Sequence, residues 1–147
     1  MTIMRKIYVC MMFLFLGLCM TAQAQKTVYT FQAHQVDNFI NEVYGDQAQT
    51  MIFSNKQRYQ TLRKLILERM QIIRQAEIRD KKYPKISEVG MLNMYNKELK
   101  HDGLFNKNTF NPLKYNLEFF DRNGLRAYRI DNTEYLLIIQ PQPKLQN

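Results

Sequence analysis

Four residues are the candidates for acid–base chemistry in this sequence: His34, His101, Asp102 and Asp131. They could form the site of a small hydrolase only if the fold brings their side chains to hydrogen-bonding distance, about 3 Å. His101 and Asp102 are adjacent in sequence, and adjacent side chains rarely aim at one point. The chain also lacks the Gly-x-Ser-x-Gly pattern of a serine nucleophile. We therefore expect surface histidines and assign no catalytic residue.

Metal and cofactor motifs are scarce. No His-x-x-x-His pair occurs, and the only cysteines, Cys10 and Cys19, lie in the N-terminal apolar run. Asp121 and Asn123 are spaced as in a calcium loop, but Leu125 stands where the next oxygen ligand belongs. With five glycines in the chain, and no phosphate-binding pattern among them, we expect no nucleotide binding by a glycine-rich loop. We expect no metal and no other cofactor.

Positive charge is concentrated in one segment. Residues 56–82 contain nine basic and three acidic side chains, a net charge of +6, in a chain whose formal net charge is +8. A segment of this kind is attracted to anionic surfaces. The alternative is a solvated helix face whose charge only aids solubility. The candidate contacts for an anionic ligand or surface are Lys56, Arg63, Lys64, Arg69 and Arg74.

Arg69 interrupts an otherwise apolar helical arc, and three interpretations stay open. Its stem could lie along the apolar face while its head stays in solvent. It could be buried and paired with a carboxylate such as Glu42 or Glu134. It could also line a pocket and hold an anionic ligand, for which a planar guanidinium is suited.

The first 24 residues are typical of a cleavable signal peptide. Arg5 and Lys6 precede an uncharged apolar run over residues 7–20, which is shorter than the roughly 18–20 residues of a transmembrane helix. The Ala-Gln-Ala sequence that follows predicts cleavage between Ala24 and Gln25. We expect residues 25–147 to form a single, small, basic and cysteine-free domain, exported to the periplasm or beyond, with no transmembrane anchor.

The elements that must position these residues follow from apolar spacing. A helix is expected over residues 36–44, ended by Gly45, after a brief strand near residues 28–31. Ser54 and Gln57 match a capping box, and the apolar period behind them predicts a long helix over residues 55–78. Ser87 could begin a short helix over residues 87–99.

The C-terminal third changes to the alternation of strands. Strands are expected over residues 115–119, 128–130 and 135–139, joined by turns at Asn123-Gly124 and Asp131-Asn132. Residues 135–139 are continuously apolar, as in a strand covered on both faces. The sequence therefore predicts an α+β fold, with two or three helices packed on a C-terminal three-stranded antiparallel β-meander.

Three functions fit these observations. The first is a non-enzymatic binding or interaction protein of the bacterial cell envelope. Its partner would be an anionic envelope component, such as lipopolysaccharide, phospholipid headgroups or an acidic polysaccharide, or another envelope protein. Nucleic acid is not expected for an exported chain. The alternatives are a small hydrolase built from the scattered histidines and aspartates, and an assembly subunit that uses exposed strand edges.

Overall fold

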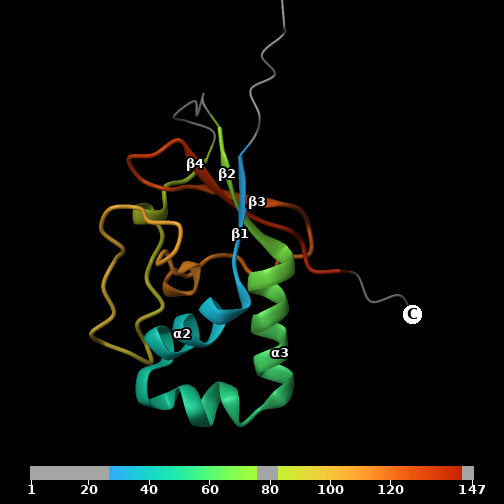
Figure 1. Cartoon of the computed structure of the whole chain (residues 1–147), viewed down its shortest axis with the longest axis vertical. Coiled ribbons are helices and arrows are strands. Elements are labelled where there is room, and N and C mark those ends of the chain that lie inside the picture. Colours follow the sequence, from blue (N-terminus) through green and yellow to red (C-terminus); the bar gives the residue numbers. More distant parts are fainter. Residues whose placement is uncertain (1–26, 76–82, 144–147) are drawn as a thin grey trace, which may run out of the picture.

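The computed structural model describes residues 27–75 and 83–143 and has an α+β fold (Figure 1). Four antiparallel strands form one sheet in the order β1-β2-β4-β3. They are β1 (Val28–Thr30), β2 (Met70–Arg74), β3 (Arg126–Arg129) and β4 (Tyr135–Ile139). The predicted fold class is confirmed, with four strands in place of the expected three. The predicted leader and its cleavage position, Ala24 and Gln25, lie outside the described residues.

The first predicted helix is present as α2 (Ala33–Tyr44). It buries the expected apolar stripe, and Gly45 ends it with a φ of 52°, a conformation that glycine adopts at little cost. A 3-10 turn and a π-helical turn (Gln49–Phe53) lead to the second helix, α3 (Lys56–Lys64). The N-cap of α3 is Asn55 rather than Ser54, one residue later than predicted.

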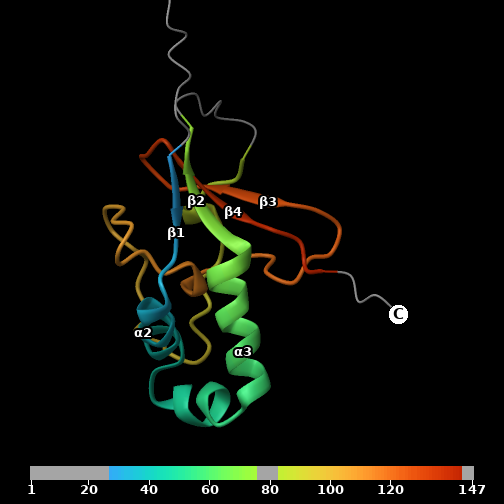
Figure 2. The same cartoon turned by 45° about the vertical axis from the view of Figure 1, so that its right-hand side comes forward.

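The long helix expected over residues 55–78 is wrong in its second half. After α3, a π-helical turn (Leu65–Arg69) leads directly into β2, as Figure 2 shows. Strand β2 lies between β1 and β4. Two adjacent residues of this strand, Ile72 and Ile73, are 1% and 4% exposed. A helix on the protein surface buries one stripe, whereas a central strand buries consecutive β-branched residues on opposite faces. Short apolar runs fit both periods, which is why spacing alone misassigned this segment.

The expected meander is present only in part. β4 and the turn at Asp131-Asn132 are confirmed, with Asn132 at a φ of 56°. The strand expected over residues 128–130 is present as β3, which begins two residues earlier and ends at Arg129. Residues 115–119 are not a strand. They follow a 3-10 turn (Pro112–Lys114), and Tyr115 forms one isolated bridge with Met91. The free side of β4 is instead paired with β2, so the middle of the chain supplies the strand.

The short helix expected over residues 87–99 is also wrong. A 3-10 turn (Ile86–Glu88) replaces its start, and the remainder is irregular. Its backbone bonds go to a distant segment, because Leu92 N donates to Lys114 O and Asn116 N donates to Gly90 O, both at 2.7 Å. These bonds replace the internal bonds of a helix and fix the segment against residues 114–116.

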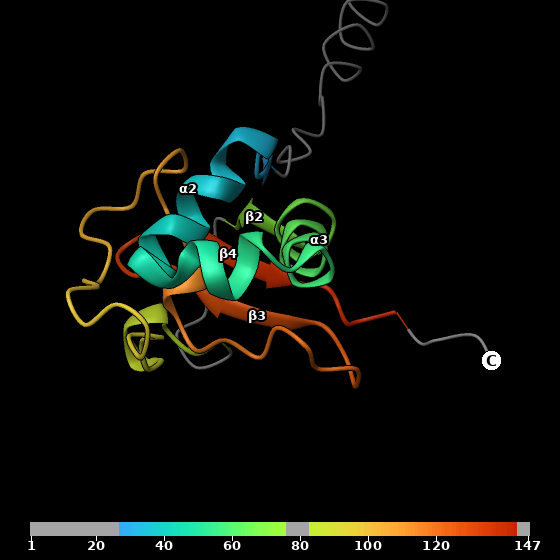
Figure 3. The same ribbon diagram turned by 90° about the horizontal axis from the view of Figure 1, so that it is seen from below.

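The main core lies between the sheet and the helices, which Figure 3 shows in front of β3 and β4. A smaller cluster of Ile73, Leu136 and Ile138 covers the other face of the sheet, with Tyr83 and Ala127 packed against it. Strand β4 is therefore buried on both faces, as predicted. In the described part of the chain, no helix combines the length and apolarity that crossing a membrane requires.

Candidate functional site

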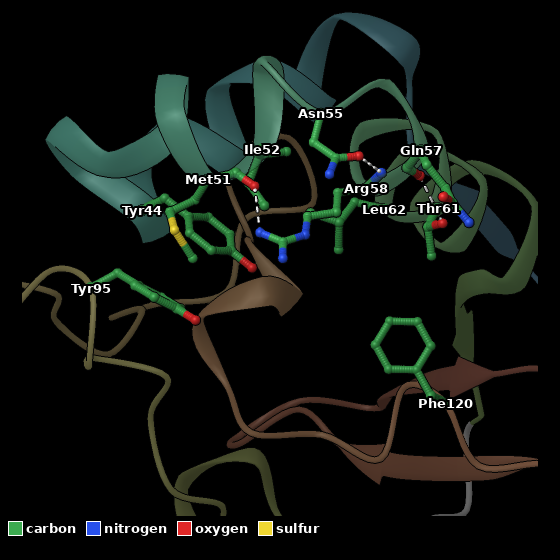
Figure 4. Close-up of a pocket in the computed structure, with 10 residues that line it drawn as sticks. All are labelled: Tyr44, Met51, Ile52, Asn55, Gln57, Arg58, Thr61, Leu62, Tyr95 and Phe120. Carbon is green, nitrogen blue, oxygen red and sulfur yellow. Dashed lines mark hydrogen bonds between the residues drawn. The ribbon is translucent and has the colours of Figure 1, made fainter.

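An open cleft of about 500 Å³ lies between the N-terminal end of α3 and the irregular segments opposite it (Figure 4). Its volume falls in the range of small-molecule sites, about 300–1,000 Å³. The cleft combines apolar and aromatic side chains with one cation and three neutral polar groups. The lining residues are Tyr44, Met51, Ile52, Asn55, Gln57, Arg58, Thr61, Leu62, Tyr95 and Phe120.

Arg58 is the only charged residue in this lining. Its backbone N–H donates to the Asn55 side chain at 3.1 Å, which is the N-cap bond of α3. Its guanidinium donates to Met51 O at 3.2 Å and extends toward the two tyrosines (Figure 4). No carboxylate of residues 27–75 or 83–143 forms an ion pair with it. Arg58 therefore brings an uncompensated positive charge to the cleft.

Two tyrosine rings form one side of the cleft. Tyr44 ends α2, Tyr95 comes from the irregular segment, and their rings stack at 4.8 Å with an interplanar angle of 27°. Burial, and to a smaller extent the neighbouring Tyr95, raises the pKa of Tyr44, and Arg58 only partly opposes this. The Tyr44 hydroxyl is therefore protonated at neutral pH and can donate a hydrogen bond. Figure 4 shows the Tyr44 hydroxyl beside the guanidinium, with the Tyr95 hydroxyl farther from it on the same side of the cleft.

Phe120 lies on the other side of the cleft, and Arg69 fixes the backbone next to it (Figure 4). The Arg69 guanidinium donates to Phe119 O at 2.7 Å and to Gln140 O at 2.8 and 3.2 Å. Burial lowers the pKa of Arg69. Its head thus binds backbone carbonyls, an arrangement that none of the three interpretations included. The two suggested carboxylate partners are engaged elsewhere.

The remaining basic candidates separate into two groups. Lys56, Arg63 and Lys64 do not line the cleft. They lie within about 100° of one another on α3, on what we call its outer side, and form no ion pair with a described residue. Arg74 is on β2 and pairs with Glu134 at 2.7 Å, with more than half of each side chain exposed. The basic segment is therefore not one continuous surface, and its residues 76–82 lie outside the described part.

A buried lysine supports the side of the cleft that carries Tyr95. Lys114, 8% exposed, forms ion pairs with Glu42 on α2 at 2.5 Å and with Asp102 at 2.7 Å. Burial lowers the pKa of Lys114, but its bonds to the two carboxylates outweigh this, so the pKa is raised overall. Asp102 also accepts a hydrogen bond from the Tyr115 hydroxyl at 3.0 Å. This network, which the sequence analysis missed, connects α2 to the irregular segment over residues 89–111.

Two further bonds connect that network to the cleft. Asn96, next to Tyr95, donates to Glu42 O at 2.8 Å. Asn111, fully buried, donates to the Glu42 carboxylate at 2.9 Å and to Phe39 O at 3.1 Å. The C-terminal half of α2 therefore binds the irregular segment at Asn96 and at Asn111, and the Asn96 bond lies next to the stacked rings of Tyr95 and Tyr44.

The four candidates for acid–base chemistry do not form one group, although His101 and Asp102 both contact Tyr115. His34 lines a separate hollow with Lys107 and Asn108, and the His101 ring lies 5.7 Å from that of Tyr115. Asp102 is in the lysine network, and Asp131 accepts two bonds from Ser87 at 2.6 and 2.9 Å. Within residues 27–75 and 83–143, no three His, Asp or Glu side chains are grouped to hold a metal ion.

The sequence analysis missed four residues of the site: Arg58, Tyr44, Tyr95 and Phe120. One signal was available for Arg58. It precedes Leu62 and Leu65 by four and seven residues, which puts it beside the apolar stripe of α3. The two tyrosines and Phe120 come from three segments that only the tertiary fold brings together. Comparison with protein-family models, curated proteins and solved structures gave no match to this chain.

Proposed function

We propose that this chain is a non-enzymatic binding protein of the bacterial cell envelope, and that the cleft beside α3 takes the negatively charged group of its ligand. The observation that carries the proposal is Arg58. Its guanidinium makes one hydrogen bond to the protein and lies in an open cleft with no carboxylate partner among the described residues. A planar guanidinium with unused N–H groups matches the oxygens of a carboxylate or phosphate.

The neutral groups around Arg58 support binding rather than proton transfer. The raised pKa of Tyr44 keeps that hydroxyl protonated near neutral pH, so it serves as a donor and not as a base. The lining contains no histidine, aspartate or glutamate. Donors without an acid–base pair are suited to holding an anion in place.

The cations on the outer side of α3 support the same proposal. Lys56, Arg63 and Lys64 add positive potential next to the cleft and would speed the approach of an anionic partner. The leader sequence supports an envelope location, because it has the basic start, apolar run and Ala-x-Ala end of a signal peptide.

Two variants of α3 test the proposal. Arg58→Gln removes the charge in the cleft, and Arg63→Gln removes one charge from the outer side of the same helix. Protein produced from the full-length chain would be titrated at low ionic strength with three anionic probes: phosphatidylglycerol vesicles, lipopolysaccharide and polygalacturonate. We expect salt-sensitive binding of at least one probe, weakened far more by Arg58→Gln than by Arg63→Gln.

Two results would contradict this function. One is no binding of any anionic probe at low salt. The other is equal weakening by the two variants, which would indicate diffuse attraction to the helix and no role for the cleft. The purified protein should also begin at Gln25 on N-terminal sequencing, and an intact Met1 would contradict the envelope location.

A further inference from the structure

We infer that the ligand of the cleft is a uronate-bearing polysaccharide, whose sugar carboxylate binds Arg58 and whose pyranose ring packs on the aromatic side chains. This inference rests on the proposed function and names its ligand class. Three features of the cleft carry it: its single charge, its aromatic rings on opposite sides, and its uncommitted amide and hydroxyl groups.

The charge of the cleft matches one carboxylate better than a phosphate. Arg58 supplies a single positive charge, and the Tyr44 hydroxyl near it is a neutral donor. Phosphate sites commonly use the free backbone N–H groups of a helix N-terminus. One of those groups is already taken here, since the side chain of Asn55 accepts from Arg58 N at 3.1 Å. A uronate ring brings one negative charge for the one cation.

The rings are arranged for a flat, mostly polar body. The stacked pair of Tyr44 and Tyr95 lies on one side of the cleft, and Phe120, half exposed, lies on the other (Figure 4). The faces of a pyranose ring carry C–H groups that pack on aromatic rings, while its edge carries hydroxyls. A lipid acyl chain requires an enclosed apolar tunnel instead, because polar groups beside it would lose hydrogen bonds to water.

The polar groups provide partners for those hydroxyls. The Gln57 side chain forms no hydrogen bond with a described residue, and amide groups both donate and accept. Thr61 donates to Gln57 O at 2.9 Å and keeps lone pairs that can accept. With the tyrosine hydroxyls, these groups surround the space between the rings, where the edge of a bound sugar would lie.

The test uses oligosaccharides that differ in one property each. Protein produced from the full-length chain would be titrated calorimetrically with trigalacturonate, trimannuronate, the methyl ester of trigalacturonate, inorganic phosphate and phosphatidylglycerol vesicles. We expect binding of at least one uronate. Arg58→Gln should weaken it about 10- to 100-fold, the worth of a charge-assisted hydrogen bond, as should esterification. Phe120→Ala should weaken it about 2- to 10-fold, and the control Arg63→Gln less than about threefold.

The outcomes separate this inference from the proposed function. Arg58-dependent binding of phosphate or vesicles, with neither uronate bound, would overturn the ligand class and leave an anion-binding cleft. Binding of the methyl ester as tight as that of the free acid would also overturn it. If no anionic probe binds in a manner that depends on Arg58, both the inference and the proposed function fail. Unchanged thermal midpoints of the variants would show that each result reports on binding and not on folding.

Discussion

Lys114 gives the sharpest test of how the cleft is supported. The substitution Lys114→Met keeps an unbranched side chain only one atom shorter and removes the charge that Glu42 and Asp102 share. Removing one partner of a buried ion pair lowers the free energy of unfolding by about 3–5 kcal/mol, because the other charge remains buried without a partner. Asp102 is in that situation, as its side chain is 17% exposed and cannot turn freely to water.

The exposed fractions set the expected size. Glu42 is 42% exposed, so water replaces much of its interaction with Lys114, and its share is that of a surface pair, below about 1 kcal/mol. Asp102 also keeps its bond from the Tyr115 hydroxyl. We therefore expect Lys114→Met to lower the free energy of unfolding by about 2–4 kcal/mol. In a domain of this size, that lowers the melting temperature by roughly 10 °C.

Arg74→Met is the matched control. It also replaces a cation paired with a glutamate, but both side chains of that pair are more than half exposed. Its expected cost is about 0–1 kcal/mol. Urea unfolding followed by circular dichroism measures both variants. Equal and small losses would refute the view that Lys114 is worth more because it is buried.

A second substitution tests the physical cause. If the cost of Lys114→Met comes from the charge left on Asp102, then Asp102→Asn should recover part of the stability in the Lys114→Met background. The same change in the original chain should be destabilising, because it weakens the ion pair. This reversal of sign is a coupling energy that a double-mutant cycle measures. Destabilisation by Asp102→Asn in both backgrounds would show that packing, and not charge, dominates.

Three further predictions concern stability. Arg69→Met should cost about 1–3 kcal/mol in urea unfolding, because it leaves two part-buried carbonyls without their donor, and a neutral result would contradict the bonds seen here. Stability should fall as the pH rises above about 10. The pKa values of Lys114 and Tyr115 are raised in the folded protein. Each group therefore contributes its full stabilisation at a pH below its pKa in the unfolded chain, and this stabilisation is lost as the pH rises through its pKa in the folded protein. Tyr115→Phe should reduce this alkaline loss. Gly45→Ala should cost about 1 kcal/mol or more, because a φ of 52° is strained for alanine, and an unchanged melting temperature would contradict this.

The accuracy of the sequence analysis depended on how local each signal was. Helix α2 was found because one amphipathic period and a terminal glycine define it. Strand β4 was found from its continuous apolar run, and the turn at Asn132 from the Asp131-Asn132 pair that precedes the strand. Strand β2 was missed because Met70, Ile72 and Ile73 fit the apolar arc of a helix as well as a central strand. The pairing that decides between them, with β1 and β4, joins segments far apart in sequence.

The candidate site was missed for a related reason. Its cation, Arg58, looks like any other member of a basic segment until the helix phase is known, and Tyr95 and Phe120 lie in segments without regular structure. Arg69 was recognised as exceptional, but the helix expected around it excluded the correct answer. Its backbone partners on residues 119 and 140 become neighbours only when β2 pairs with β4.

The two buried cations explain how irregular segments can form a defined cleft. Arg69 fixes the backbone beside Phe120 to the end of the sheet, and Lys114 with its carboxylates fixes the segment of Tyr95 to α2. Neither cation lines the cleft. Arg58 does line it, and its side chain contributes only one hydrogen bond to the described structure. Stability and binding are therefore separable by residue. Substituting Arg69 or Lys114 should alter both, whereas substituting Arg58 should alter binding far more than stability, since its guanidinium makes a single bond to the described chain, at Met51 O in the turn before α3.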